Sequence, residues 1–260
     1  MKYEHIVSER EEDIATLTLN RPEKLNAINQ KMIEELESAI AEISKDTSVR
    51  VLIITGAGRA FCSCADVSDM AQATAPIDTR HWLAGAHKII LAIANFEKPV
   101  IAKVKGAAVG FRCSLALSTD LTIASENAQF SLIFTRIGLI PNGWSLFHLP
   151  RLVGLAKAKE LVLTGKKIDA KEAERIGLIS KAVPPNELDH EVNALSKQLA
   201  KGPTVAFGIA KKIMNEGLNM SLGSVLECEA FGQTLVGTTE DAKEGVIAFL
   251  EKREPQFKGR

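Results

Sequence analysis

Short apolar segments rich in β-forming residues alternate with amphipathic helical patterns through the first two thirds of the chain, and this alternation constrains its fold most. Strands are predicted at residues 13–19, 49–55, 98–104, 121–124 and 179–183, where such segments end in glycine, proline or polar residues. Apolar residues at helical spacing predict helices over residues 30–44 and 79–95. Strands that alternate with helices indicate an α/β fold with parallel strands and crossover helices.

The last part of the chain has a different pattern. From Pro203 onwards the apolar spacing is helical, and it predicts helices over residues 205–217, 222–235 and 239–249. Neither a low-complexity linker nor a fixed-period repeat divides the chain. We therefore predict an α/β core over residues 1–200 and a helical region over residues 201–260, which packs on its own body or on a neighbouring subunit.

Composition excludes several classes of protein. Lys and Arg together number 32, as do Asp and Glu, so the chain lacks the basic excess of a nucleic-acid-binding protein. No apolar run approaches the roughly 20 residues of a membrane-spanning helix, and the polar first ten residues do not resemble a signal peptide. The four cysteines are too few for a disulfide framework, and Cys62 and Cys64 have no second pair or nearby histidine for a metal. We predict a cytoplasmic protein without a metal site.

Two segments carry recognisable motifs. One follows the second predicted strand, at residues 58–67 (GRAFCSCADV), and the other contains the third strand, at residues 98–110 (KPVIAKVKGAAVG). They resemble two motifs of the crotonase (enoyl-CoA hydratase/isomerase) superfamily. Shorter matches follow the family's order at residues 20–27, 128–130, 138–141, 163–165, 173–178 and 249–253. The ordered set covers nearly the whole chain, which makes the resemblance specific although no single motif is decisive.

The resemblance implies an architecture and a substrate class. The expected fold is a crotonase-like spiral of ββα units, with a C-terminal helical region that mediates oligomerisation. The expected assembly is a homotrimer or a dimer of trimers. The expected substrate is an acyl-CoA thioester, in which coenzyme A is part of the substrate, so that no separate cofactor is required.

The same resemblance implies an oxyanion hole made of backbone groups. The donors correspond to the N–H groups of Ala65 and Phe111. A thioester carbonyl gains negative charge as it becomes an enolate or a tetrahedral adduct, and fixed N–H groups at that oxygen lower the barrier. The second donor is expected at the start of a helix, where the helix dipole also favours negative charge.

Four further residues correspond to family contacts with coenzyme A. Lys24 and Ala27 match the loop that lies along the cofactor, whereas Phe249 and Lys252 match a C-terminal pair that reaches a neighbour's coenzyme A. Each has a structural alternative. Either lysine can be a solvated surface charge, and Phe249 can be part of the core.

The chain departs from the family at the positions of its catalytic carboxylates. Ser114 and Phe134 occupy the two positions where hydratases have glutamates, and Asn142 occupies the position of the aspartate of isomerase and dehalogenase relatives. None of these side chains accepts a proton at neutral pH. Ordinary acid–base chemistry through carboxylates is therefore not expected at these positions.

Other departures replace small residues with larger ones. Cys64 stands where the family has glycine, Phe111 and Arg112 lie in the glycine-rich turn, and Trp144 stands where small residues are usual. Because glycine serves where backbones approach closely, these changes predict a crowded pocket. Their clustering at the site has two explanations, a specialised natural branch or an engineered pocket.

Three hypotheses for activity follow. In the first, Cys64 attacks an ester or thioester carbonyl, with His148 as the base and Arg112 lowering the pKa of the thiol. In the second, the chain hydrates or isomerises an enoyl-CoA independently of Cys64. In the third, it is a catalytically silent oligomer that binds acyl-CoA. The structural alternative to the first hypothesis is that Cys64 is a small buried residue without a chemical role and that His148 contributes only to packing.

Overall fold

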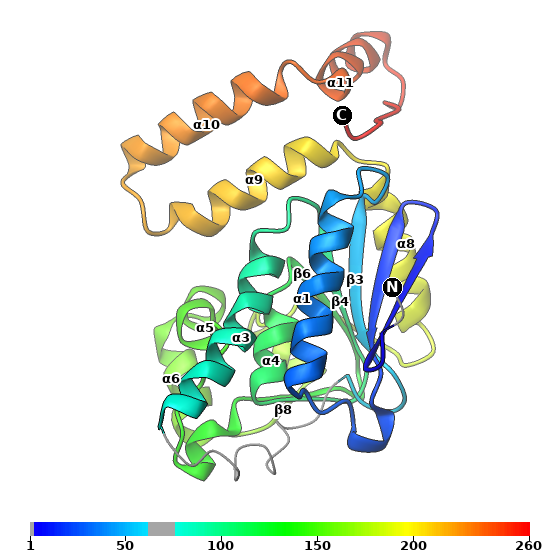
Figure 1. Cartoon of the computed structure of the whole chain (residues 1–260). Coiled ribbons are helices and arrows are strands. Elements are labelled where there is room, and N and C mark those ends of the chain that lie inside the picture. The colour runs from blue at the N-terminus through cyan, green and yellow to red at the C-terminus, as the bar shows by residue number, and fades with distance from the viewer. Residues whose placement is uncertain (1–2, 62–75) are drawn as a thin grey trace.

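Two β-sheets form the centre of the protein (Figure 1). The computed structural model describes residues 3–61 and 76–260. The larger sheet has the strand order β1-β2-β3-β4-β6-β9, in which β1 and β2 are antiparallel and every later pair is parallel. Its strands are β1 (Ile6–Glu11), β2 (Ile14–Leu19), β3 (Val51–Gly56), β4 (Val100–Val104), β6 (Leu121–Ser125) and β9 (Lys181–Val183). The predicted α/β class and its parallel strands are confirmed.

Strand β1 was not predicted from the sequence, for a physical reason. Its sequence is IVSERE, and only Ile6 is buried. It lies at the edge of the sheet, where one face and one side are solvated, so its apolar signal is weak.

The smaller sheet lies next to the candidate site. It consists of β5 (Ala107–Val109), β7 (Gln129–Ser131) and β8 (Ile168–Asp169) in the order β5-β7-β8. Strands β5 and β7 are parallel, and β7 and β8 are antiparallel.

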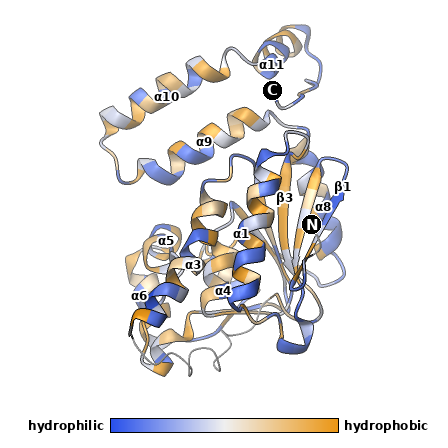
Figure 2. Cartoon of the chain, viewed as in Figure 1, coloured by the Kyte–Doolittle hydropathy of each residue, from blue (hydrophilic) through white to orange (hydrophobic). Residues whose placement is uncertain are grey.

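Helices cover both faces of the larger sheet. Leu52 and Ile54 of β3 belong to the hydrophobic cluster that contains α1 (Gln30–Lys45), α3 (Pro76–Ala94) and α4 (Phe111–Leu117). Val51 and Ile53 of the same strand belong to a second cluster with α8 (Leu188–Ala200). Successive side chains of a strand point to opposite faces, so β3 is buried on both sides. Its sequence is accordingly mostly apolar, and Figure 2 shows the strand mainly in the hydrophobic colour.

The other helical elements between the strands are short, and α5 among them contacts α4. They are η1 (Pro22–Lys24), η2 (Ile133–Ile137), α5 (Ser145–Val153), α6 (Leu155–Thr164) and α7 (Ala170–Arg175). Helix α4 has seven residues, all of them buried. It is therefore a core helix, and its first turn is held rigidly between the sheets and α5.

The C-terminal helices form a separate layer, at the top of Figure 1. They are α9 (Thr204–Gly217), α10 (Leu222–Val236) and α11 (Glu240–Glu251), close to the predicted bounds. Lys211 of α9 docks this layer on the core by donating to the carbonyls of Ile93 and Lys98 and to Asp120 Oδ2, 2.8 Å away. The boundary at residue 200 and the role in oligomerisation stay predictions.

The segment after α11 returns to the larger sheet. Arg50, which precedes β3, donates to the carbonyl of Phe257 at 3.0 Å, to the hydroxyl of Thr204 and to the carbonyl of Gly202. The start of β3 is thereby joined to the end of the chain.

Within the described part of the chain, no helix combines the length and apolar character needed to cross a membrane.

Candidate functional site

The site is built around the tight turn that precedes α4. Gly110 has a φ of 67°, a conformation that favours glycine, and its N–H donates to the carbonyl of Ser131 in β7 at 2.8 Å. Phe111 follows as the first residue of α4, so its N–H has no acceptor within the helix. The geometry agrees with the oxyanion donor expected at Phe111.

A buried pair of hydroxyls ties α4 to the turn before α5. Ser114 Oγ donates to the carbonyl of Asn142 at 2.8 Å and lies 2.5 Å from Ser145 Oγ. Because the Ser114 hydrogen points to Asn142, Ser145 is the donor in the second bond. Ser145 was not recognised from the sequence, since a serine at the start of a helix has no distinctive signal there.

The turn itself has two consecutive residues with positive φ. Gly143 has a φ of 63°, and a Cβ added there would lie 2.6 Å from the Phe111 ring. Trp144 has a φ of 75°, which is unusual for a residue other than glycine. Only glycine fits between this turn and Phe111. The crowding of the pocket as a whole, to which Cys64 was expected to contribute, stays a prediction.

His148 lies one helical turn after Trp144. Its ring is 3.9 Å from the indole of Trp144, edge to face. Burial, with a smaller contribution from the charge of Arg151, lowers the pKa of His148 to about 4, so its imidazole is neutral at pH 7. Its Nδ1 is buried and has no hydrogen-bond partner within residues 3–61 and 76–260. A neutral imidazole with an uncommitted nitrogen can take up a proton.

The remaining pocket residues predicted from the sequence lie close to α4. Arg112 is 1% exposed, so its guanidinium is enclosed in the core. Phe134 is buried, and its ring faces Gly110. Asn142 Oδ1 is buried without a partner in the described part of the chain. Their proposed roles stay predictions, as do those of Phe111, Ser114, Trp144 and His148.

Two predicted residues lie outside the described part of the chain. They are Cys64, the proposed nucleophile, and Ala65, the proposed second oxyanion donor.

The four residues matched to coenzyme A contacts do not come together within one chain. Lys24 is exposed on η1 and Ala27 is buried beside it, whereas Phe249 and Lys252 lie at the end of α11. The segment around η1 is at the bottom of Figure 1 and α11 is at the top. Phe249 is 83% exposed, so the alternative that it belongs to the core of the chain is wrong.

A small cavity joins the residues of the turn to α4. Its volume of about 10 Å³ leaves room for about one water molecule. It is lined by Ser114, Leu117, Ser118, Gly143, Trp144, Ser145, His148 and Leu149.

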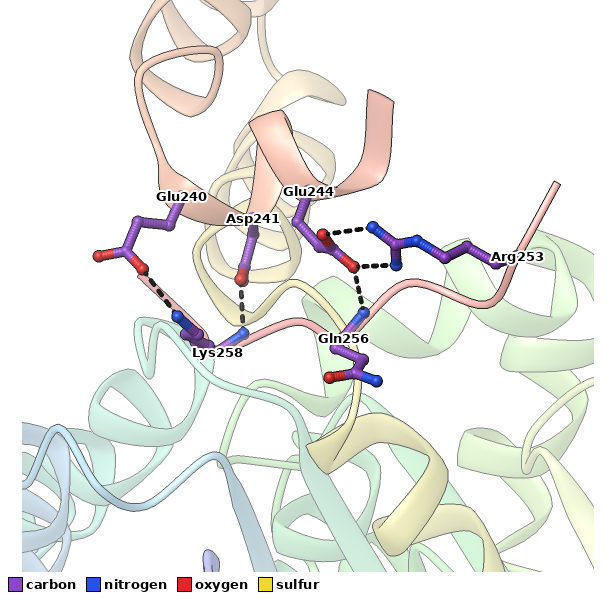
Figure 3. Close-up of a pocket in the computed structure, with 6 residues that line it drawn as sticks. All are labelled: Glu240, Asp241, Glu244, Arg253, Gln256 and Lys258. Carbon is purple, nitrogen blue, oxygen red and sulfur yellow. Dashed lines mark hydrogen bonds and ion pairs between the residues drawn. The ribbon is translucent and has the colours of Figure 1, made fainter. Parts of the chain in front are cut away.

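A second cavity, drawn in Figure 3, lies between α11 and the segment after it. Its charged groups are paired with one another. Asp241 accepts from the N–H groups of Lys258 and Gly259, and Glu244 forms a two-bond pair with Arg253. These contacts anchor the C-terminal segment, so the cavity is a structural feature. The described residues include no group of three or more His, Cys, Asp or Glu side chains arranged to hold a metal.

Comparison with known proteins identifies the family. The sequence model for enoyl-CoA hydratase/isomerase matches residues 9–260. The chain belongs to the enoyl-CoA hydratase/isomerase family. Relatives in this family include a probable enoyl-CoA hydratase of Rhodobacter capsulatus, 42% identical over all of both chains. They also include the 1,2-epoxyphenylacetyl-CoA isomerase of Escherichia coli, 36% identical over 99% of both.

Solved structures of family members have the same fold. The enoyl-CoA hydratase of Bacillus anthracis superposes with a TM-score of 0.93 at 32% identity, over 99% of this chain and all of that one. A hydratase subunit of Geobacillus kaustophilus superposes with a TM-score of 0.94 at 33% identity, over all of both chains. The predicted crotonase-like fold is confirmed.

Proposed function

We propose that this protein is an enzyme that binds an acyl-CoA thioester and hydrates or isomerises the double bond of its enoyl group. The observation that carries the proposal is the turn at Gly110 and Phe111, which presents a backbone N–H at the start of a rigid, buried helix. Full-length similarity to relatives named as hydratases and as an isomerase supports the substrate class.

The proposed role of the turn is to stabilise the oxygen of the thioester carbonyl. That oxygen accepts a hydrogen bond from Phe111 N–H and, as the family resemblance implies, from Ala65 N–H. Donors fixed before the reaction stabilise the enolate-like transition state more than the substrate, by several kcal/mol in comparable sites. The dipole of α4 adds to the same effect.

The proposed proton-transfer group is His148. Ser114, Phe134 and Asn142 provide no carboxylate, whereas His148 lines the same cavity as Ser114. Burial lowers the pKa of His148 to about 4 and makes it a weak base in the free protein, so the step depends on the negative charge of the enolate, which favours the imidazolium. In hydration, His148 takes a proton from water as the water oxygen bonds to C3 of the enoyl group. The imidazolium then returns a proton to C2, so that atoms and charge balance.

The test is turnover of crotonyl-CoA, followed by the loss of ultraviolet absorbance of the enoyl thioester. We expect His148→Gln to lower kcat about 10²–10⁴-fold, the usual effect of removing an acid–base group. Cys64→Ala is the control and is expected to retain activity. Equal rates in parent and His148→Gln would exclude His148, and crotonyl-CoA binding without turnover would indicate the catalytically silent oligomer.

A second candidate function is ester or thioester cleavage by Cys64. The observation that favours this function is the neutral imidazole of His148, which can accept the proton of a thiol. The thiolate would form an acyl-enzyme, the leaving group would take the proton from the imidazolium, and water would release the acid. Rapid mixing with an activated aryl ester tests this. A burst of phenol that disappears in Cys64→Ala would support it, and equal traces without a burst would exclude it. Similarity to hydratases favours the first candidate.

A further inference from the structure

Trp144 holds a backbone conformation that its side chain disfavours. Its φ of 75° and ψ of −5° place it in the left-handed region, directly after Gly143 in the same region. It caps α5 without a side-chain hydrogen bond to the helix. Strained residues that persist are held by their surroundings and concentrate at functional sites.

The surroundings fix the turn on three sides. Ser114 holds the carbonyl of Asn142, and Ser145 is bonded to Ser114. Gly143 packs against the Phe111 ring so closely that a Cβ does not fit. The indole of Trp144 then lies over the first turn of α5, against the rings of His148 and Phe147.

This arrangement places the indole of Trp144 inside the candidate site. Trp144 and Ser114 line the same cavity, and Ser114 lies one helical turn after Phe111, the proposed oxyanion donor. The remaining space is sufficient for about one water molecule. No acyl chain can extend into this space unless the indole moves, so the indole limits how far a chain bound at Phe111 can extend on this side.

We propose that Trp144 is the specificity-determining residue that restricts the site to short acyl groups. The inference rests on the proposed function, because it assumes that an acyl-CoA thioester binds at Phe111. The positive φ makes the position suitable for glycine, so removing the side chain opens the pocket without disturbing the backbone.

The test compares binding of butyryl-CoA and octanoyl-CoA by calorimetry. Neither ligand has a double bond to hydrate, and release of free thiol is followed in the same samples so that cleavage is not taken for binding. We expect the parent to favour butyryl-CoA. In Trp144→Gly we expect the ratio of octanoyl to butyryl affinity to rise at least about 10-fold, because added methylenes gain a place to be buried.

Three further variants complete the design. Trp144→Asn opens the same space, and asparagine tolerates a positive φ, so it replaces the glycine variant if that variant does not fold. Trp144→Phe keeps a large ring and is expected to retain the parent's preference. Leu146 lies in the first turn of α5, is exposed and does not line the cavity. Leu146→Ala is therefore expected to change the ratio of octanoyl to butyryl affinity by less than about 3-fold.

The outcomes separate the two proposals. If both ligands bind to every variant with the parent's ratio, the role of Trp144 is overturned and the proposed function stands. If neither ligand binds to the parent or to any variant, the proposed function is overturned, and the inference is overturned with it.

Discussion

At the scale of single residues, His148 couples protonation to stability. Its pKa of about 4 in the folded protein lies below the ordinary 6.5, so the unfolded chain binds the proton first. The free energy of unfolding is therefore expected to fall as the pH drops from about 6.5 towards 4. Because the ring is only half-buried, the effect is modest, on the order of 1–3 °C in Tm between pH 7 and pH 5.

The matched variant is His148→Gln, which cannot titrate. Thermal unfolding of parent and variant from pH 7 to pH 5 isolates the contribution of this residue from that of the exposed carboxylates. We expect the parent to lose more stability than the variant. Parallel curves would mean that the imidazole is already solvated in the folded protein.

The sequence predicted the members of the site better than their contacts. Trp144 and His148 were each named from the sequence, and the structure shows that their rings are in contact. The bond between Ser114 and Ser145 was not predictable, because it joins elements that meet only after α4 and α5 pack. The exposure of Phe249 could be expected only from the family resemblance, since an aromatic residue on an apolar helix normally indicates core.

At the scale of elements, a partly buried ion pair helps to dock α9. Lys211 is 9% exposed and bonds to Asp120, which also accepts from the N–H of Val100. We expect Lys211→Met to lower the free energy of unfolding by about 1–2 kcal/mol, less than for a fully buried pair because water reaches the carboxylate of Asp120. Denaturant unfolding measures this effect.

The double variant Lys211→Met with Asp120→Asn serves as the control. It removes both charges, so its cost is expected to be less than the sum of the two single variants. A simply additive cost would show that the two residues do not act as a pair. Breaking this pair is expected to loosen the α9 layer while leaving the strands of the larger sheet intact.

The elements predicted from the sequence are those in which burial sets a clear periodicity, whereas α6, α7 and α8 were not predicted. Strand β3 is buried on both faces and reads as a continuous apolar run, and α1 has one buried stripe. The small strands β5, β7 and β8 have two or three residues each, too few to show a period. These three strands form the smaller sheet. The sequence therefore indicated this part of the fold only through the family resemblance.

At the scale of the whole molecule, the C-terminal layer exposes many apolar side chains. On α10 and α11 they include Leu222, Leu226, Phe231, Leu235, Phe249 and Leu250, each more than half exposed. Such a surface is typical of a subunit interface. The predicted homotrimer or dimer of trimers is consistent with it, and sedimentation at several protein concentrations measures the mass.

Phe231→Asp tests whether this apolar surface is the subunit interface. Phe231 is 73% exposed in the single chain, so a charge there leaves the fold intact but opposes burial between subunits. We expect a shift towards the mass of one chain of 28.1 kDa. An unchanged mass would place the interface elsewhere, whereas a parent of 28.1 kDa would contradict the predicted oligomer.

The bond between Arg50 and the carbonyl of Phe257 joins residues 207 positions apart. During synthesis, the start of β3 emerges from the ribosome long before its partner exists. The strand can therefore pair while water solvates this arginine, and the contact with Phe257 closes only after 207 further residues have been made.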